Sequence, residues 1–328
     1  MLITYVLRRI LAIIPTLLII SILVFLVIDL PPGDILSVRQ AQLLEERNPM
    51  ARSELLRLEL RYGLNRPLIV RYWLWISNFV RGDMGESMIY NLPVTRLIGQ
   101  RIALTSFLSL MTMIFTLALA VPIGVYSAVR QYSIFDRIFT VVGFLGLATP
   151  NFLLALILIL VGFQFFGQIP GGLFSPEYVD ASWSIGKVLN LLSRMWIPVI
   201  VIGTAGIAGT VRVMRGNLLD VMGQQYITTA RAKGLKERTV VTKYGVKVAI
   251  NPIISRIGLS LPQIIGGEVI VAIVLGLQTA GPLLYNAILA QDMHLAGSFL
   301  MLLSILLVLS NLLADVVLAC VDPRIKFQ

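Results

Sequence analysis

The sequence contains a single cysteine, Cys320, and a single histidine, His294. One thiol excludes an intramolecular disulfide and a metal site built on cysteines, and one imidazole excludes a histidine cluster. His294 is expected to be a polar loop residue, because no nucleophile motif of a Ser-His-Asp triad accompanies it. The phosphate-binding pattern G-x-x-x-x-G-K-[S/T] is also absent from the chain, so no nucleotide site of that kind is expected. These absences argue against an enzyme, and the sequence predicts no metal and no cofactor.

Charged residues are scarce, at 13% of the 328 residues, whereas 57% are hydrophobic, and the mean hydropathy is +0.86. Soluble globular proteins contain about 45–50% apolar residues, so the chain is expected to lie in a membrane. The formal net charge of +10 comes from 27 Lys and Arg against 17 Asp and Glu. In a soluble protein this excess would suggest nucleic-acid binding, but in a membrane protein the basic residues first have to be assigned to loops.

Long stretches with little or no charge are the main structural signal, because a helix needs about 20 apolar residues to cross a bilayer. They predict an all-α, polytopic membrane protein with six transmembrane helices, at residues 10–28, 102–129, 138–166, 195–211, 257–277 and 295–321. The third of these contains Thr149-Pro150, which is expected to kink it. We expect one transmembrane domain, residues 1–328, with a loop region at 29–101 and a five-helix core at 102–320.

The distribution of basic residues predicts the orientation of these helices. Arg8 and Arg9 precede the first span, and nine Lys and Arg lie within residues 212–256, whereas residues 278–294 contain none. Loops rich in Lys and Arg remain in the cytoplasm, while long loops are translocated regardless of their charge. Both termini and residues 212–256 are therefore predicted to be cytoplasmic and residues 29–101 extracytoplasmic. The basicity reflects topology, and no nucleic-acid partner is expected.

Three further patterns predict local structure. Residues 50–62, preceded by Asn48 and Pro49 and followed by Gly63, have the terminal signals of a short helix. Residues 66–80 contain two tryptophans and a phenylalanine, which is typical of a helix lying at a membrane interface. Gly203, Gly206 and Gly209 follow an apolar stretch without a preceding strand, so they favour close helix packing rather than a phosphate loop.

Residues 225–252 form a basic segment that is not apolar enough to span lipid. Thr228 to Lys233 tolerate a helix, and Gly234 can take the positive φ that often ends one. A helical pattern restarts at Leu235 and at residues 240–248, until Pro252 interrupts it. Two helical pieces joined at a glycine predict a solvent-facing elbow. From these residues alone, a basic loop that only fixes topology is an equally good interpretation.

This segment resembles a known motif. Thr228-Thr229-Ala230-Arg231-Ala232-Lys233-Gly234 is similar to the E-A-A-x-x-x-G pattern in the coupling loop of bacterial ABC-transporter permeases. The T-A-R-A-K-G-L version with a distant Pro252 resembles the peptide/oligopeptide/nickel branch. Resemblance to the first permease subunit of that branch extends to three other stretches: YVLRRILAIIPTLLIISILVFLVIDLPPGD near the start, RGDMGES at residues 81–87, and Asp322-Pro323-Arg324-Ile325-Lys326 near the end.

The resemblance implies a permease subunit of an ATP-binding-cassette importer, which forms half of the pathway for di- or oligopeptides delivered by an external binding protein. It further implies a second homologous permease subunit and residence in the bacterial or archaeal plasma (inner) membrane, within the lipid bilayer. ATP hydrolysis would take place on two separate ATPase subunits. These would bind the coupling loop within residues 212–256, at Thr228, Thr229, Ala230, Arg231, Ala232, Lys233, Gly234 and Leu235.

Glu268, Pro150 and Asn151 are the candidates for residues of the transport pathway. A carboxylate at membrane depth usually marks function or has a partner, so Glu268 is either a group facing the pore or a structural partner of another helix. Typical peptide permeases have their acidic residue four positions later, where this chain has Ala272. They also have a Trp-Pro-Gly turn where this chain has Leu277-Gln278-Thr279-Ala280-Gly281-Pro282.

Two kinds of alternative remain. The departure at residues 277–282 makes an importer of oligosaccharides an alternative within the same class, and an importer of nickel is a further one. Glu268 and Asp315, as acidic residues inside predicted spans, leave an ion-coupled secondary transporter as an alternative of another class. No inverted repeat of broken helices supports that second reading.

Overall fold

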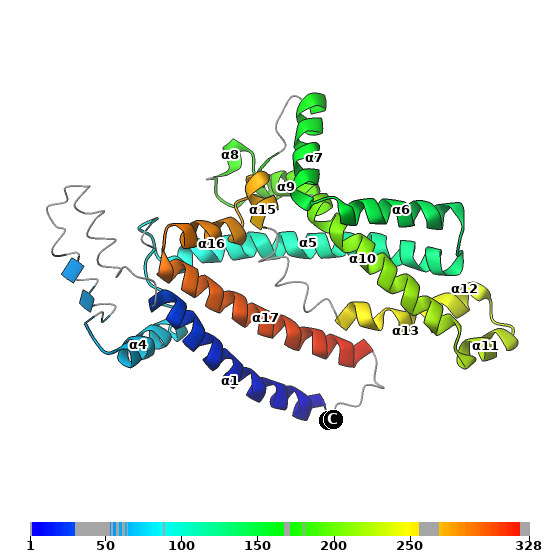
Figure 1. The fold of residues 1–328 in the computed structure, drawn as a ribbon, viewed down its shortest axis with the longest axis horizontal. Helices are drawn as coiled ribbons and strands as arrows, with labels where there is room; N and C mark the ends of the chain where they lie inside the picture. The colour runs from blue at the N-terminus through cyan, green and yellow to red at the C-terminus, as the bar shows by residue number, and fades with distance from the viewer. Residues whose placement is uncertain are drawn as a thin grey trace. The chain divides into compact units, whose positions relative to one another are not determined.

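The regular structure is helical throughout the described part of the chain. The computed structural model describes residues 2–29, 65–87, 89–166, 171–179, 181–255 and 269–321, with isolated positions between 53 and 63. Side chains are described in these ranges except at 2–10, 28 and 313–321. Apart from one isolated β-bridge between Glu86 and Pro93, the regular elements in these ranges are helices. The predicted all-α class is confirmed (Figure 1).

The chain divides into two compact units: unit 1 comprises residues 1–2, 103–282 and 309–328, and unit 2 comprises residues 3–102 and 283–308. The helices are α1 (Leu2–Asp29), α4 (Leu68–Val80), α5 (Val94–Val129), α6 (Ile134–Ala148), α7 (Asn151–Phe166), α8 (Pro176–Val179), α9 (Ile185–Arg194), α10 (Trp196–Met222), α11 (Gln225–Ala232), α12 (Glu237–Thr239), the π-helix η1 (Val240–Val246), α13 (Lys247–Ala249), α15 (Val269–Val274), α16 (Ala280–Leu289) and α17 (Met293–Val321).

Several of these helices are long and apolar enough to cross a bilayer. Among the described residues, α5, α10 and residues 293–312 of α17 meet that condition singly, and α6 with α7 meets it as a bent pair. The helix α1 covers the first predicted span, and α15 lies in the described part of the fifth. The predicted residence in a membrane agrees with these helices, while the count of six crossings and their orientation stay predictions.

The third predicted span is divided more sharply than by a kink. The helices α6 and α7 meet at an angle of 101° across Thr149 and Pro150. A residue before proline is sterically driven out of the α region, and Thr149 accordingly has φ −86° and ψ 120°. The N–H and the hydroxyl of Thr149 both donate to the carbonyl of Leu145, at 3.0 and 2.8 Å. The break is thus capped by local hydrogen bonds.

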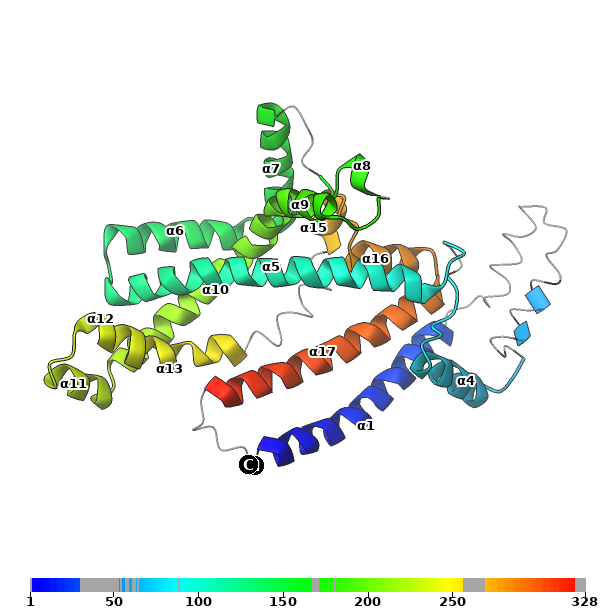
Figure 2. The same ribbon diagram turned by 180° about the vertical axis from the view of Figure 1, so that it is seen from behind.

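Helix α10 is the element on which unit 1 packs, and Figure 2 shows it crossing α5 and α6. A Cβ added at Gly203 would lie 2.9 Å from the Phe115 ring, and one added at Gly206 would lie 3.2 Å from the Thr116 methyl group. The predicted close packing of this glycine stripe is therefore confirmed at these two positions, against α5. Gly209 has no atom within 4 Å of its added Cβ.

In unit 2 a buried carboxylate holds the turn at residues 81–87. Asp292 accepts hydrogen bonds from the Ser87 hydroxyl at 2.5 Å and from the Leu295 N–H at 3.1 Å. Through the second bond Asp292 also caps the N-terminus of α17. Next to it, His294 is 7% exposed in the first turn of α17. The prediction of a loop histidine is wrong, because the α17 helix begins before the apolar run does. Likewise α16 occupies much of residues 278–294, the segment between the fifth and the sixth predicted span.

Helix α4 confirms the helix predicted within residues 66–80. Its Phe79 is buried against Val24 of α1 and Met301 of α17, whereas Trp73 is 61% exposed. At the described positions between 53 and 60 the backbone is helical, and Gly63 has φ +61°, as expected of a residue that ends a helix. The aromatic side chains of α4 thus serve both the packing of unit 2 and its surface.

The approach of α5 to α10 at Gly124 gives a stability prediction. A Cβ at Gly124 would lie 2.7 Å from the Met214 Cβ and 3.0 Å from the Val211 carbonyl oxygen. Gly124→Leu should lower the free energy of unfolding by about 1–3 kcal/mol, because the backbones of the two helices would have to separate. The measurement is SDS-induced unfolding of the purified subunit in detergent.

Gly209→Leu is the matched control, since both glycines are helical and Gly209 has open space around it. It should leave the unfolding free energy unchanged or raise it, because leucine favours a helix more than glycine. Equal losses in both variants would contradict the close approach at Gly124.

Candidate functional site: the Gly234 elbow

Residues 225–249, named here the Gly234 elbow, follow directly on α10. Helix α11 ends at Ala232, Lys233 is its C-cap, and Gly234 has φ +74°. The Gly234 N–H donates to the Arg231 carbonyl at 2.9 Å and the Leu235 N–H to the Ala230 carbonyl at 3.4 Å. These two bonds form a Schellman motif, which satisfies carbonyls at the helix end and reverses the chain. The glycine stop predicted from the sequence is confirmed.

Backbone conformation, rather than space, explains the glycine at position 234. No atom lies within 4 Å of a Cβ added at Gly234, so a side chain would meet nothing. A residue with a Cβ is strained at φ +74°, most of all when it is β-branched. Position 234 therefore determines the direction in which the chain leaves α11.

Helix α11 is held by one face and exposes the other. Ile227 and Ala230 are buried and pack with Val240, Met222 and Tyr244. The remaining residues predicted to bind ATPase subunits are exposed: Thr228, Thr229, Arg231, Ala232, Lys233, Gly234 and Leu235. The structure thus brings the eight predicted residues together in one exposed turn, within which Ala230 faces inward. Its side chain contributes to packing and is not available to a partner.

An ion pair bridges the two arms of the elbow. The Arg231 guanidinium donates to both carboxylate oxygens of Glu237, from Nε at 3.1 Å and from Nη2 at 2.6 Å. This hydrogen bond from Arg231 lowers the pKa of Glu237 below its ordinary value of 4.5, and the same bond raises the pKa of Arg231. Both side chains are exposed, so the pair contributes little to stability.

The returning arm is unusual because it is π-helical. The segment η1 lies against α10: a Cβ at Gly245 would be 2.9 Å from Leu218 Cδ1 and 3.2 Å from Met222 Sδ. Beyond η1, the Asn217 side-chain amide donates to the Ala249 carbonyl at 3.2 Å. Short insertions of π-helix occur often at functional sites. Here the arm is attached to α10 along its length.

Pro252 has a different place from the one predicted. The break in the helical path is at Ile250, and residues 251–255 are again helical. The Ile250 carbonyl accepts the N–H groups of Ile253 and Ile254, at 2.9 and 3.0 Å. Pro252 therefore lies in the first turn of a helix, where its missing N–H has no consequence. It opens a new helical segment rather than ending the old one.

The candidates for the transport pathway are not part of the elbow. Pro150 is exposed and Asn151 is half-buried, and both lie at the break between α6 and α7. Glu268 lies outside the described residues, as does the side chain of Asp315. The part of the chain that the structure describes contains no group of three or more His, Cys, Asp or Glu that could hold a metal ion. The exposed face of the elbow carries basic and hydroxyl side chains, a composition that suits contact with another protein.

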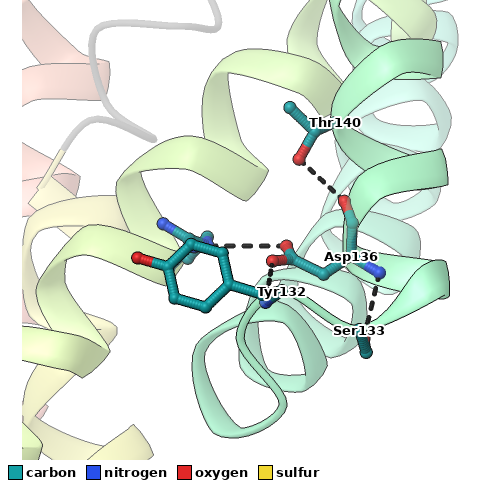
Figure 3. Close-up of polar contacts among 5 residues, drawn as sticks. Tyr132, Ser133, Asp136 and Thr140 are labelled. Atoms are coloured by element: carbon teal, nitrogen blue, oxygen red, sulfur yellow. Dashed lines mark hydrogen bonds and ion pairs between the residues drawn. The ribbon is translucent and has the colours of Figure 1, made fainter.

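One polar contact in unit 1 was missed by the sequence analysis. Asp136, 4% exposed in the first turn of α6, faces Arg215 of α10 at 3.5 Å between Oδ1 and Nε. Its other carboxylate oxygen accepts the Tyr132 N–H at 2.9 Å (Figure 3). The two charged residues are 79 positions apart, so no spacing rule could have paired them. The available signal in the sequence was that Asp136 and Arg215 each lie at the end of an apolar run, where charged residues of neighbouring helices can meet.

The ion pair in the elbow gives a pH-dependent prediction. Glu237→Gln should speed hydrogen exchange of the α11 backbone amides by no more than about fivefold, because an exposed ion pair contributes about 0.2–1 kcal/mol. The pKa of Glu237 is lower in the folded state, so its contribution is complete above the ordinary value and is lost as pH falls through the lowered one. The difference in α11 exchange rate between Glu237→Gln and the wild type, measured by mass spectrometry at each pH, should therefore disappear below the lowered pKa of Glu237.

Lys236→Gln removes a neighbouring exposed charge and serves as the control. It should leave α11 exchange at the wild-type rate at every pH. A difference for Glu237→Gln that persists at low pH would contradict the role of the carboxylate.

Comparison with known proteins extends these observations to the whole chain. Residues 120–327 match the family described as "Binding-protein-dependent transport system inner membrane component". The oligopeptide transport system permease protein AppB of Bacillus subtilis (strain 168) is 37% identical over 98% of this chain and 99% of that protein. The glutathione transport system permease protein GsiC of Salmonella choleraesuis (strain SC-B67) is 31% identical over 99% of both chains. The chain belongs to the family of inner-membrane components of binding-protein-dependent transport systems.

Proposed function

We propose that this chain is the transmembrane permease subunit of an ATP-binding-cassette importer and forms half of the pathway for peptides. The observation that carries the proposal is similarity over the full length, since 98% of the chain aligns with an oligopeptide permease protein and 99% with a glutathione permease protein. Both relatives are named for peptide substrates. Family membership also favours a binding-protein-dependent importer over the ion-coupled alternative.

The Gly234 elbow is the proposed contact with separate ATPase subunits. Its exposed α11 face carries Thr228, Arg231 and Lys233, and its inward face is fixed by Ile227 and Ala230. A short helix that is packed on one face and closed by a Schellman motif can pass on a displacement as a unit. A flexible basic loop that only set topology would need neither the Schellman motif nor the ion pair.

The proposal includes an arrangement in the membrane and a set of partners. Six spans with both termini in the cytoplasm would place the elbow on the ATP side and residues 29–101 on the other. A second homologous permease subunit would complete the pathway. Two ATPase subunits would bind on the cytoplasmic side, and an external binding protein would deliver the peptide. The plasma (inner) membrane of a bacterium or archaeon is the proposed location.

Residues 277–282, which stand where typical peptide permeases have a Trp-Pro-Gly turn, leave an oligosaccharide as the first alternative substrate class. The residues that replace the usual Trp-Pro-Gly turn are well anchored: Leu277, Thr279 and Ala280 are buried, and the Ala280 N–H donates to the Thr105 hydroxyl at 2.9 Å. An oligosaccharide importer would be the conclusion if the reconstituted complex took up labelled oligosaccharides, but not di- or oligopeptides, with its own binding protein. Nickel uptake by the same reconstituted complex is measured alongside.

Gly234→Val tests the role of the elbow. Valine at φ +74° costs about 1–3 kcal/mol of strain, which the chain relieves by turning α11 out of its position. We expect the subunit to remain in the membrane, while peptide uptake and substrate-stimulated ATP hydrolysis both fall at least tenfold. A factor of ten corresponds to about 1.4 kcal/mol, which lies within the expected strain. The assay is uptake and phosphate release in proteoliposomes containing the complete complex.

The control is Gly234→Asn, because asparagine tolerates a positive φ better than other residues with a Cβ. It should retain most of the uptake, and binding of peptide by the external protein should be unchanged in both variants. Undiminished uptake by Gly234→Val would remove the elbow from the proposed mechanism.

Accessibility tests the proposed orientation. After Cys320 is replaced by serine, a cysteine at Asn65 should react with an impermeant maleimide added outside intact cells. A cysteine at Glu237 should react only after the cells are opened, since the basic elbow is expected in the cytoplasm. Labelling in the opposite sense would overturn the orientation and the proposed ATPase contact together.

A further inference from the structure

Asp136 is an almost completely buried carboxylate, and it is not part of the proposed coupling contact. It stands where the turn at residues 130–133 enters α6. The Ser133 hydroxyl accepts the Asp136 N–H at 3.2 Å, and the Thr140 hydroxyl donates to the Asp136 carbonyl at 2.7 Å (Figure 3). Its carboxylate Oδ2 accepts the N–H of Tyr132, which has φ +61°. The carboxylate therefore holds the turn and the N-terminus of α6 together.

The other oxygen of this carboxylate faces a different helix. Asp136 Oδ1 lies 3.5 Å from Nε of Arg215, in the second half of α10. Arg215, Leu218 and Met222 are spaced by three and four residues, so they lie along one face of α10. The same face reaches the elbow, because Leu218 and Met222 flank Gly245 of η1 and Met222 also packs with Ile227 and Ala230 of α11. One face of α10 thus contacts the elbow at one end and Asp136 at the other.

We propose that Asp136 is a positioning residue, which links the coupling contact to the α5–α6 hairpin through Arg215. This inference rests on the proposed function of the elbow. When the elbow is displaced, Met222 and Leu218 move with it, since they are packed against it, and the Arg215 side chain moves with the same face of α10. Asp136 then carries the displacement into the turn at residues 130–133 and into α6, which leads to the 101° break at Thr149 and Pro150.

The chemistry of the pair suits such a link better than apolar packing would. The Asp136 side chain is 6% exposed and the Arg215 side chain 32% exposed, and opposite charges attract over a range of separations, so the pair can follow a small displacement without losing its interaction. A purely structural pair would serve only to stabilise the fold, and its loss would be repaired by neutralising both partners. A linking pair is needed for its charge. The variant in which both Asp136 and Arg215 are neutral would then fold, but would pass less of the displacement from the elbow to α6.

The test compares transport with ATP hydrolysis in the complete reconstituted complex. Asp136→Asn keeps a side-chain oxygen that can accept the Tyr132 N–H and removes the charge facing Arg215. We expect the number of peptides taken up per ATP hydrolysed to fall by roughly 2-fold to 30-fold, the range for residues that carry coupling between sites. Asp220→Asn, the same change at an exposed position on α10, is the matched control and should leave the ratio unchanged.

The double variant Asp136→Asn with Arg215→Gln separates linkage from stability. It leaves no unpaired buried charge, so it should assemble even if Asp136→Asn alone does not. A low ratio of uptake to hydrolysis in the assembled double variant supports the link, and a wild-type ratio overturns it. Gly234→Val, measured in parallel, tests the proposed function on its own. A fall in both uptake and substrate-stimulated hydrolysis in Gly234→Val, together with a wild-type ratio of uptake to hydrolysis in the double variant, would refute only the role of Asp136.

Discussion

The backbone of a chain in lipid has to satisfy its own hydrogen bonds, and this constraint explains both the regular and the irregular parts of the structure. Hydrocarbon offers no partner for a free N–H or carbonyl group, so spanning segments are helical. At the break between α6 and α7, local bonds replace some of those that are lost, because Thr149 donates twice to Leu145. The exposed end of α11 at Gly234 is closed in a similar way, by the Schellman pair, although water is available there. Both changes of direction are therefore built from capped helix ends.

Much of the candidate site could be predicted from the sequence because its signals are local. Gly234 follows a helix-compatible run, and only glycine takes a positive φ without strain, so the turn could be expected from neighbouring residues. The glycine stripe at 203 and 206 could be read in the same way, because small residues in an apolar run have few other uses. The all-α class followed from the length of the apolar runs alone.

Helix ends and long-range contacts could not be predicted in this way. Helix α10 continues eleven residues beyond the expected end at 211, to Met222, because loss of apolarity marks the edge of lipid and not the end of a helix. Helix α5 likewise begins at Val94, eight residues before position 102. The pairing of Asp136 with Arg215 depends on how α6 and α10 cross, which no local pattern contains. The 101° angle at Pro150 depends equally on packing, since proline alone predicts a break and not its size.

The π-helical turn of η1 absorbs one residue of chain length. Residues five apart lie about 140° apart around an α-helix, at about 100° per residue, but close to one face on a π-helix, whose bonds join residues i and i+5. Val240 and Gly245, both buried, are such a pair. Removing one residue between them would restore an ordinary α-helix, in which the pair would be four apart and about 40° apart around the axis. Ala249 and Ile253 would then keep their side of the segment, toward Met214 and Leu218, so the loss of one residue here disturbs the packing less than a loss elsewhere in the arm.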